Sequence, residues 1–380
     1  MCSPRGVTSE TTRAATDVPR LGHGIYAHAA TLDRDAVDHP QPNRRERLTA
    51  LPKVELHLHL EGTISPEQAV ELARRHGCDP DVALPLEDGR YPRRYRGFDH
   101  FLQTFLAVSA LVRTPEDLHD VATALAEDRR QQGIAYSEVT FTAATHVRAG
   151  MDPAAMWEAL RTGLAAEPEA RIALIVDVVR DDGEAGVEET LALIEAADAP
   201  IVGLGLSGTE DAAPAATFHL LRTAADHLGL GVSVHAGETG PASHVRAAVT
   251  ELGADRIGHG IAAADEPALL DLLARTGVVL EVCPSSNLAL GLVNSLDAHP
   301  LPALRDAGVT VTIGSDDPPF FGTTLTDELE QAAGLLDGDE DLIADLQVAA
   351  ARAAFAPAAV RAELEAAVEA WRVSPAGSRW

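Results

Sequence analysis

Two histidines separated by one leucine stand at the end of an apolar run. His57 and His59 lie in the stretch VELHLHLEG, residues 54–62. In an extended strand, residues i and i+2 point to the same side, so the two imidazoles can bind one metal ion together. The pair is also compatible with strand histidines that are satisfied by hydrogen bonds, and the rest of the chain decides between the two interpretations.

Further polar residues follow three other strand-like runs. They are His235 and Glu238 in VSVHAGE (232–238), His259 in RIGHG (256–260), and Asp316 and Asp317 in VTIGSDDP (311–318). Taken singly, they suit turn histidines, a first-turn glutamate and an aspartate pair that caps a helix. If the runs are strands of one barrel, however, their ends meet at a single mouth and the side chains form one site.

The chemistry of this set is that of metal-assisted hydrolysis. Nitrogen and oxygen ligands suit one zinc ion per chain and leave a position for water, which zinc makes reactive at neutral pH. The expected ligands are His57, His59, His235 and Asp316.

Three further residues can assist the attack without binding the ion. Glu238 lies three residues beyond His235, across a glycine turn, and can transfer a proton to a substrate nitrogen. His259 can polarise or orient the water, and Asp317 can accept a hydrogen bond from the substrate. The expected reaction is attack of water on an sp² carbon.

A regular alternation of strand-like and helical segments must position these residues. After the first run, strand-like segments are expected at Ile134–Phe141, Ile172–Val179, Ile201–Leu206, Val232–His235, Arg256–Gly258, Val278–Cys283 and Val309–Ile313. Helical patterns occupy Pro66–Arg75, Phe98–Val112, Pro115–Gln132, Val187–Ala197, Ala216–Leu228, Ser243–Leu252, Pro267–Arg275 and the tail Leu325–Trp371. The series predicts an α/β TIM (β/α)8 barrel with additional helices after strand 1 and at the C-terminus, and a doubly wound open sheet is the alternative.

Composition limits the class of protein. The 380 residues are 46% hydrophobic and carry a net charge of -28, so a nucleic-acid partner is not expected. Residues 49–380 are expected to form a single barrel domain, and residues 1–48 a largely disordered extension. The three cysteines give no disulfide framework and no Cys-x-x-Cys zinc motif. Without an apolar leader or a membrane-length run, the chain is expected to be cytoplasmic and to bind no membrane.

Some features remain open at this point. The oligomeric state and the role of residues 1–48 are undetermined. The helical insertion 79–132 can cover part of the mouth, but the helical spacing of Phe98, Phe101, Phe105 and Leu106 favours core packing over a lid.

The sequence resembles the adenosine/adenine deaminase family of metal-dependent hydrolases, which have an amidohydrolase-type barrel. The similarity covers most of residues 50–340 and is carried by six motifs in family order. They are HLHLEG (57–62), LSGTE (206–210), HAGE (235–238), RIGHG (256–260), CPSSN (283–287) and SDDP (315–318). Together they are far more specific than any one of them alone.

The resemblance implies roles for individual residues. It implies zinc held by the four ligands named above, Glu238 protonating purine N1, and His259 activating the hydroxide that attacks C6. Asp317 would contact N7, and Gly208 would offer its backbone N–H to N3. Ammonia would leave and a 6-oxopurine would form.

Two positions bear on the substrate. Nucleoside deaminases of this family carry Asp, directed toward the ribose, where this chain has Glu61. Glu at this position resembles the adenine deaminase branch and deaminases of altered nucleosides. Gly208, in contrast, resembles the nucleoside branch. The balance favours deamination of a 6-aminopurine nucleoside, adenosine or a modified adenosine. The alternatives are an adenine deaminase acting on the free base and an aminodeoxyfutalosine deaminase.

Two other classes of protein are compatible with parts of the pattern. One is a barrel that binds purines or a partner protein without turnover. The other is a hydrolase of amides or esters, which often has a second metal bridged by a modified lysine. The only lysine of the chain, Lys53, precedes strand 1, which argues against such a bridged pair.

Overall fold

The structure is a computed structural model that describes residues 44–374. The expected disordered extension, residues 1–48, lies mostly outside the described residues. The part of it that is described differs from expectation, because α1 (Arg44–Ala50) is a helix that buries Leu48 completely.

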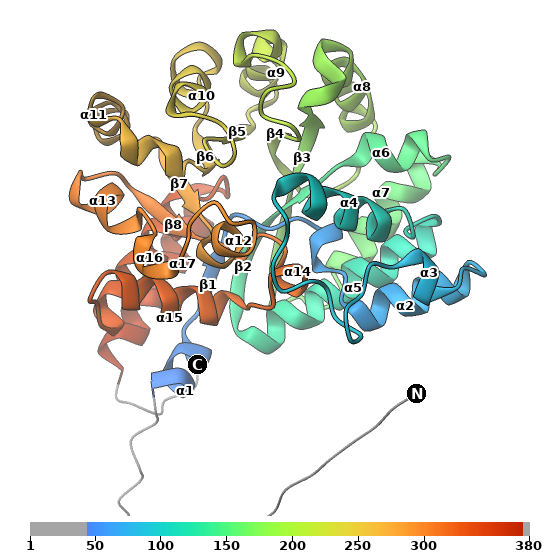
Figure 1. Ribbon diagram of the computed structural model, residues 1–380, viewed down its shortest axis with the longest axis horizontal. Helices are drawn as coiled ribbons and strands as arrows, with labels where there is room; N and C mark the ends of the chain where they lie inside the picture. Colours follow the sequence, from blue (N-terminus) through green and yellow to red (C-terminus); the bar gives the residue numbers. More distant parts are fainter. Residues whose placement is uncertain (1–43, 375–380) are drawn as a thin grey trace, which may run out of the picture. The chain divides into compact units, whose positions relative to one another are not determined.

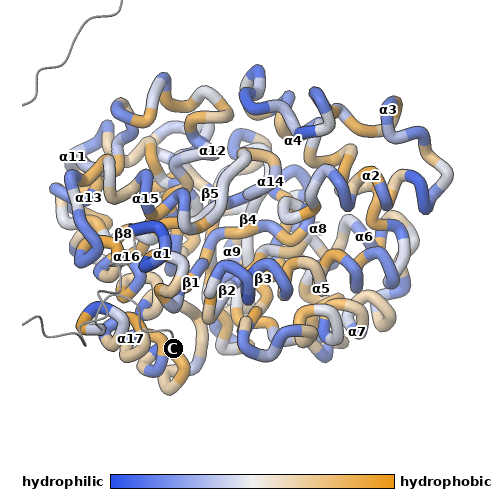
Figure 2. The backbone as a smooth tube through the Cα atoms, turned by 90° about the horizontal axis from the view of Figure 1, so that it is seen from below, coloured by the Kyte–Doolittle hydropathy of each residue, from blue (hydrophilic) through white to orange (hydrophobic). Residues whose placement is uncertain are grey.

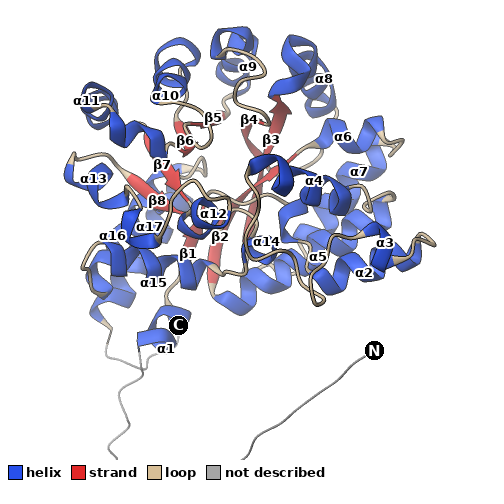
Figure 3. Cartoon of the chain, in the orientation of Figure 1, coloured by secondary structure: helices blue, strands red, loops and turns tan. Residues whose placement is uncertain are grey.

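Eight parallel strands form the centre of the molecule, and each pairs with the next strand in the sequence (Figure 3). They are β1 (Lys53–Glu55), β2 (Ile134–Phe141), β3 (Arg171–Val179), β4 (Ile201–Ser207), β5 (Gly231–Ala236), β6 (Arg256–His259), β7 (Val279–Val282) and β8 (Val311–Ile313). An open doubly wound sheet would reverse its strand order, so that alternative is wrong and the expected TIM barrel is confirmed.

The barrel closes at the expected metal site. His57 and His59 lie beyond the short β1, in an extended segment between β2 and the end of β8. The backbone N–H of Asp316 donates to His57 O, and the N–H of His59 donates to Asp316 O, both at 3.1 Å. Parallel bridges join Leu58 to Asp316 and His59 to Thr140. Closure and the positioning of three candidate ligands therefore depend on the same backbone contacts.

Helices surround the strands in a ring (Figure 1). They are α2 (Pro66–Arg75), α3 (Pro80–Ala83), α4 (Phe98–Ser109), α5 (Pro115–Gln132), α6 (Ala143–Arg148), α7 (Pro153–Leu164), α8 (Gly183–Glu195), α9 (His219–Leu228), α10 (Ala242–Ala247), α11 (Pro267–Thr276), α12 (Pro284–Ala289), α13 (Leu301–Asp306), α14 (Pro318–Phe321), α15 (Leu325–Leu335), α16 (Glu340–Ala353) and α17 (Ala358–Val373). Short helical turns lie at Glu61–Thr63, Arg180–Asp182, Ala215–Phe218, Ala248–Leu252, Ile261–Asp265 and Leu296–Ala298. The expected extra helices are therefore present after β1 and at the C-terminus.

Local sequence explains where the helices begin and end. In α5, Thr114 and Asp117 form a reciprocal capping box, Pro115 occupies the first turn, and Gly133 ends the helix in the left-handed conformation. Outer helices such as α11 and α13 carry hydrophilic stretches on the outside of the molecule (Figure 2). No helix among residues 44–374 is long and apolar enough to cross a membrane.

Buried charges fill the barrel interior beneath the site. The Arg256 guanidinium lies 2.6 Å from Glu138 and 2.5 Å from Glu281, and it stacks at 3.6 Å on the ring of Phe355, between α16 and α17. These charged residues are at most 1% exposed. A buried charge is tolerated only when it is paired, so this chain of contacts links the C-terminal helices to the residues behind the metal site.

Candidate active site and metal centre

Four side chains from the ends of β1, β5 and β8 meet in one place. The ligand atoms of His57, His59, His235 and Asp316 all lie within 4.8 Å of one another. The Nε2 atoms of His59 and His235 are 3.2 Å apart, and Asp316 Oδ1 lies 3.4 Å from Nε2 of both His57 and His59. A tetrahedral ion with bonds of about 2.0–2.1 Å to nitrogen has ligand–ligand edges of about 3.3 Å, so these spacings suit zinc.

Glu281, on β7, fixes the orientation of His57. Glu281 Oε2 accepts hydrogen bonds from His57 Nδ1 at 2.9 Å and from Ser233 Oγ at 3.0 Å. His57 Nε2 therefore faces the ligand group, where it is buried without a hydrogen-bond partner among the described residues. Such a carboxylate behind a ligand histidine sets the tautomer and strengthens the ligand. The residues present thus fit a metal ion.

The charges of the ligand group favour a cation. Burial lowers the pKa of His59 and of His235, so both rings are neutral and have a free lone pair. Burial also lowers the pKa of His57, but the nearby carboxylates of Asp316 and Glu281 outweigh this effect and raise it to about 10. A proton on His57 therefore occupies the place that a metal ion would take.

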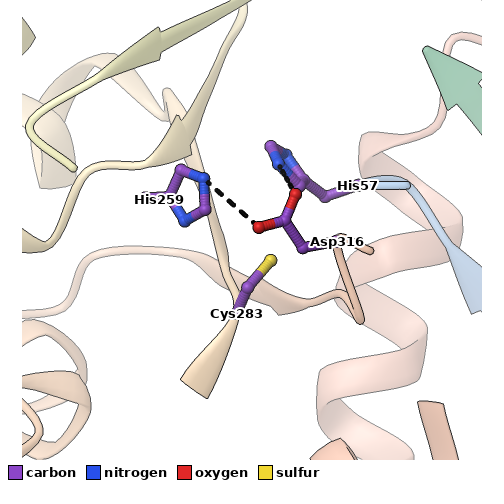
Figure 4. A group of neighbouring side chains, drawn as sticks. All are labelled: His57, His259, Cys283 and Asp316. Atoms are coloured by element: carbon purple, nitrogen blue, oxygen red, sulfur yellow. Dashed lines mark ion pairs between the residues drawn. The ribbon is translucent and has the colours of Figure 1, made fainter. Parts of the chain in front are cut away.

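A second group of potential ligands overlaps the first. Cys283 and His259 lie beside His57 and Asp316, again with all ligand atoms within 4.8 Å (Figure 4). Burial and then nearby carboxylates raise the pKa of the Cys283 thiol well above its usual value, whereas metal ligation needs the thiolate. His259 Nε2 lies 3.9 Å from Asp316 Oδ2, which is wider than a zinc edge. The group with His59 and His235 is the better candidate.

Glu238 lies in the loop after β5, and Glu210 holds this loop. The Glu210 carboxylate accepts four successive backbone N–H groups, from residues 237–240, at 2.7 to 3.1 Å. Glu238 Oε1 lies 3.6 Å from His259 Nε2. Burial, followed by the charges of Asp316 and Glu210, raises the pKa of Glu238 well above its usual value. The raised pKa favours the protonated carboxyl, which is the form that can give a proton.

Asp317 reaches the cleft because Gly62 has no side chain. A Cβ on Gly62 would lie 1.7 Å from Asp317 Oδ1. That oxygen is buried and has no hydrogen-bond partner among the described residues. Burial, together with the charge of Asp316, raises the pKa of Asp317 well above its usual value. A raised pKa favours the protonated form, so Asp317 can donate to a ligand as well as accept from one, as expected from the sequence.

Two residues of the site have an unusual backbone conformation. His259 and Asp316 have φ values of 59° and 62°. Residues other than glycine seldom adopt this left-handed conformation, which costs roughly 1–2 kcal/mol. The side chains of both residues belong to the groups of potential ligands described above, so the surrounding barrel stabilises this conformation where the site needs it.

The cleft has one polar side and one apolar wall. Its polar lining includes Glu61, Thr142, Ser207 and Gly208. Glu61 Oε1 contacts His146 Nε2 at 2.8 Å. The hydroxyls of Thr142 and Ser207 both donate to buried Asp177, so their oxygens remain as acceptors.

Helix α4 forms the apolar wall of the cleft. This side is lined by five apolar residues of α4: Phe98, Phe101, Leu102, Phe105 and Leu106. Phe101 also packs on Phe321, with 5.2 Å between ring centres. The spacing of these residues favoured core packing over a lid, and the structure combines core packing with a place in the cleft wall. Leu106, at the rim, is 50% exposed.

Eight of the nine residues expected in the site line this single cleft, and the ninth, His57, belongs to the ligand group beneath it. The sequence model described as adenosine deaminase matches residues 52–371. The chain belongs to the adenosine deaminase family. It is therefore a hydrolase of the deaminase type, which acts on a C–N bond and depends on a metal.

Relatives within the adenosine deaminase family carry different substrate names. An aminodeoxyfutalosine deaminase of Streptomyces avermitilis is 37% identical over 85% of this chain and 92% of its own length. An adenine deaminase of Streptomyces coelicolor is also 37% identical, over 76% of this chain and 87% of its own length. The structure of an adenine deaminase from Arthrobacter aurescens is 33% identical, with a TM-score of 0.79 over 85% of this chain and all of that one.

Sequence reasoning missed the residues that support the site. Glu281, Arg256, Asp177, His146 and Glu210 bind or orient the groups described above. One signal was available, because an isolated acid within an apolar strand, as in VLEV (279–282) or IALIVDVV (172–179), must find a buried partner. The identity of that partner depends on distant segments and could not be read from spacing.

Proposed function

We propose that this chain hydrolyses the 6-amino group of a purine nucleoside that carries no phosphate, with one zinc ion per chain, giving the 6-oxo product and ammonia. The observation that supports this most is a metal-ligand group and two buried carboxyl groups with raised pKa in one cleft. Burial raises the pKa of both Glu238 and Asp317, and this favours the protonated forms that can donate to the basic ring nitrogens of a neutral purine.

Each residue has a role in this proposal. A zinc ion held by His57, His59, His235 and Asp316 would supply a water-derived nucleophile at neutral pH. Glu238 gives its proton to N1 as C6 is attacked. The hydroxyl proton of the resulting adduct then passes, through the Glu238 carboxylate, to the amino group, which leaves as ammonia while C6 becomes a carbonyl. Asp317 donates to N7, and the N–H of Gly208 donates to N3. His259 contacts the attacking oxygen.

The lining of the cleft supports a substrate without phosphate. None of the described residues that line it is Arg or Lys, so a dianionic phosphate would find no cation outside the metal site. The oxygens of Glu61, Thr142 and Ser207 accept hydrogen bonds, as hydroxyls of a sugar require.

Two alternative substrates are each supported by particular observations. Free adenine is favoured by Glu61 in place of the Asp of nucleoside deaminases, and by the adenine deaminase relative. Aminodeoxyfutalosine, a modified adenosine, is favoured by the relative named for it and by the apolar wall of α4, which can cover an extended substituent.

Parallel incubations with adenosine, adenine, aminodeoxyfutalosine and AMP, followed by ammonia release, test the proposal. We expect turnover of adenosine or its modified form, and none of AMP. Turnover of adenine alone would place the chain with the free-base enzymes, and faster turnover of AMP would contradict the phosphate argument. Metal analysis should find about one zinc per active chain.

A substitution tests the acid separately from the metal. Glu238→Gln should keep the zinc and lose about 10²–10⁴-fold in kcat, because the amide cannot give up a proton. Exposed Glu251 provides the control, and Glu251→Gln should leave kcat unchanged. Near-normal turnover of Glu238→Gln would remove Glu238 from the mechanism.

A further inference from the structure

A chain of hydrogen bonds runs behind His259, away from the cleft. His259 Nδ1 lies 3.4 Å from the Asn287 side-chain amide nitrogen, on α12. Asn287 Oδ1 lies 3.0 Å from His299 Nε2, and His299 Nδ1 accepts the backbone N–H of Leu301, at the start of α13, at 3.1 Å. His259, Asn287 and His299 are each at most 3% exposed. None of the catalytic roles above uses Asn287 or His299.

The direction of this chain is fixed at its far end. A backbone N–H can only donate, so His299 Nδ1 must be an acceptor. Burial lowers the pKa of His299 to about 4, so the ring is neutral and its one proton is on Nε2. Nε2–H donates to Asn287 Oδ1, which turns the amide N–H₂ toward His259. His259 Nδ1 must then accept, and the proton of its neutral ring lies on Nε2.

We propose that Asn287 and His299 are positioning residues that hold His259 as the Nε2–H tautomer. The Nε2–H group faces the cleft, 3.6 Å from Glu238 Oε1 and 3.9 Å from Asp316 Oδ2. If the proposed deamination is correct, His259 enters the reaction as a hydrogen-bond donor to the attacking oxygen and does not take a proton from it. A ring nitrogen that carries a proton also cannot bind a metal, which is a second reason against the Cys283 group.

The tautomer can be read without any substrate. Zinc-loaded protein labelled with ¹⁵N-histidine would be examined by NMR, in which the two neutral tautomers have different nitrogen shifts and proton couplings. The chain has 15 histidines, so the signals of His259 are identified by their loss in His259→Gln. We expect the proton of His259 on Nε2. A proton on Nδ1, or a metal-bound His259, would overturn the proposal.

The variant Asn287→Asp is designed to reverse the direction of the hydrogen bond between residue 287 and His259. A carboxylate can only accept from both rings, so His259 should move its proton to Nδ1 and present a bare Nε2 to the cleft. Reversing a histidine tautomer costs about 10⁴-fold in a serine-protease triad. We expect kcat to fall at least about tenfold, with KM changed less than about threefold. An unchanged kcat together with a reversed tautomer would show that the tautomer does not matter.

Two controls separate this effect from damage to the fold. Exposed Asn294 lies in the segment between Asn287 and His299, and Asn294→Asp makes the same chemical change outside the chain of contacts. It should keep the tautomer and kcat. If Asn287→Asp does not fold, His299→Phe removes the anchor at similar volume, and His259 should become a mixture of tautomers. A single Nε2–H form in that variant would contradict the role of His299.

The outcomes distinguish this inference from the proposed function. An Nε2–H His259 in a protein that releases no ammonia from any purine would keep the hydrogen-bond chain and remove the deamination. An Nδ1–H His259 in an active deaminase would keep the proposed deamination and remove the inferred role of Asn287 and His299.

Discussion

At the scale of single residues, the site contains two neighbouring carboxyl groups whose pKa values are shifted in opposite directions. Burial raises the pKa of Asp316, but His57, whose Nε2 lies 3.4 Å from Asp316 Oδ1, outweighs this effect and keeps the carboxylate ionised. Its neighbour Asp317 has a raised pKa, and the Oδ1 atom of Asp317 has no hydrogen-bond partner among the described residues. Environments that push neighbouring acids apart in this way mark separate chemical roles.

Two substitutions test whether Asp317 donates a hydrogen bond to the substrate. Asn keeps a donor at nearly the same position, whereas Ala keeps neither donor nor acceptor. We therefore expect Asp317→Asn to retain at least about tenfold more kcat/KM than Asp317→Ala, since a lost buried hydrogen bond costs about 1–3 kcal/mol. Steady-state kinetics with the best substrate decide the matter. Equal activities of the two variants would show that donation to N7 is not the role of this side chain.

The candidate site illustrates which residues a sequence can reveal. The nine expected residues share strand ends or glycine turns, and those local features point to one barrel mouth. Their roles remain predictions, whereas their convergence is observed. The left-handed backbone of His259 and Asp316 could not be anticipated, because only the surrounding barrel stabilises such strained positions.

At the scale of elements, the alternation of strands and helices was predictable, and the contacts between loops were not. The bounds of α5 follow from its caps, Thr114 and Gly133. In contrast, the loop after β5 takes its shape from Glu210, which follows β4. Because that pairing joins two separate loops, spacing within either one gives no sign of it.

Glu210→Gln should loosen the loop that carries Glu238. An amide offers one acceptor oxygen and a repelling N–H₂ to the four backbone N–H groups that the carboxylate now binds. We expect kcat to fall at least about tenfold with zinc retained, because a displaced acid transfers its proton less well. Exposed Asp211, the next residue, gives the matched control Asp211→Asn, which should behave as wild type. Loss of zinc in Glu210→Gln would indicate wider damage instead.

Glu328 couples α15 to α12 and makes stability depend on pH. Its carboxyl is completely buried and accepts the backbone N–H of Ser285 at 3.1 Å. Burial raises its pKa from 4.5 to about 7. A raised pKa in the folded state means that this contribution is full below about pH 4.5 and is lost as pH rises through 7.

Glu328→Gln should remove this dependence, because an amide stays neutral. The variant should become more stable relative to wild type as pH rises from 5 to 8. The difference in unfolding free energy should grow by up to about 3 kcal/mol and appear as a higher relative melting temperature. Thermal unfolding at several pH values measures the difference, and exposed Glu251→Gln should show no such trend. A constant difference across this range would contradict a buried, largely protonated Glu328.

At the scale of the whole molecule, the two ends of the barrel have different tasks. The strand ends carry the site, while α1 packs against the C-terminal helices. Arg45 pairs with Asp327 on α15 at 2.8 Å, and Trp371 on α17 donates to the backbone oxygen of Arg47 at 3.1 Å. The sequence suggested that residues before 49 are an extension, because α1 is too short to show a helical period.

Helix α1 also supports the only lysine of the chain. Lys53, at the start of β1, is completely buried, and its Nζ donates to the backbone oxygens of Leu48, Thr49 and Leu51 at 2.7 to 3.3 Å. Burial lowers the pKa of Lys53 to about 7. Without these oxygens a buried ammonium would have no acceptor, so α1 contributes to the stability of the first strand.

Two truncations test where the folded barrel begins. We propose that residues 1–43 are dispensable, so that a chain starting at Arg44 should match the full chain in melting temperature and kcat. A chain starting at Leu51 loses the buried side chain of Leu48, the contact with Trp371 and two acceptors of Lys53. It should be destabilised by at least about 2–3 kcal/mol, since a buried leucine alone contributes that order of energy. Below its melting temperature its kcat should be nearly normal, because α1 contributes nothing to the cleft. Equal stability of the two truncations would mean that α1 is not part of the folded barrel, whereas inactivity of the longer one would assign residues 1–43 a role in catalysis.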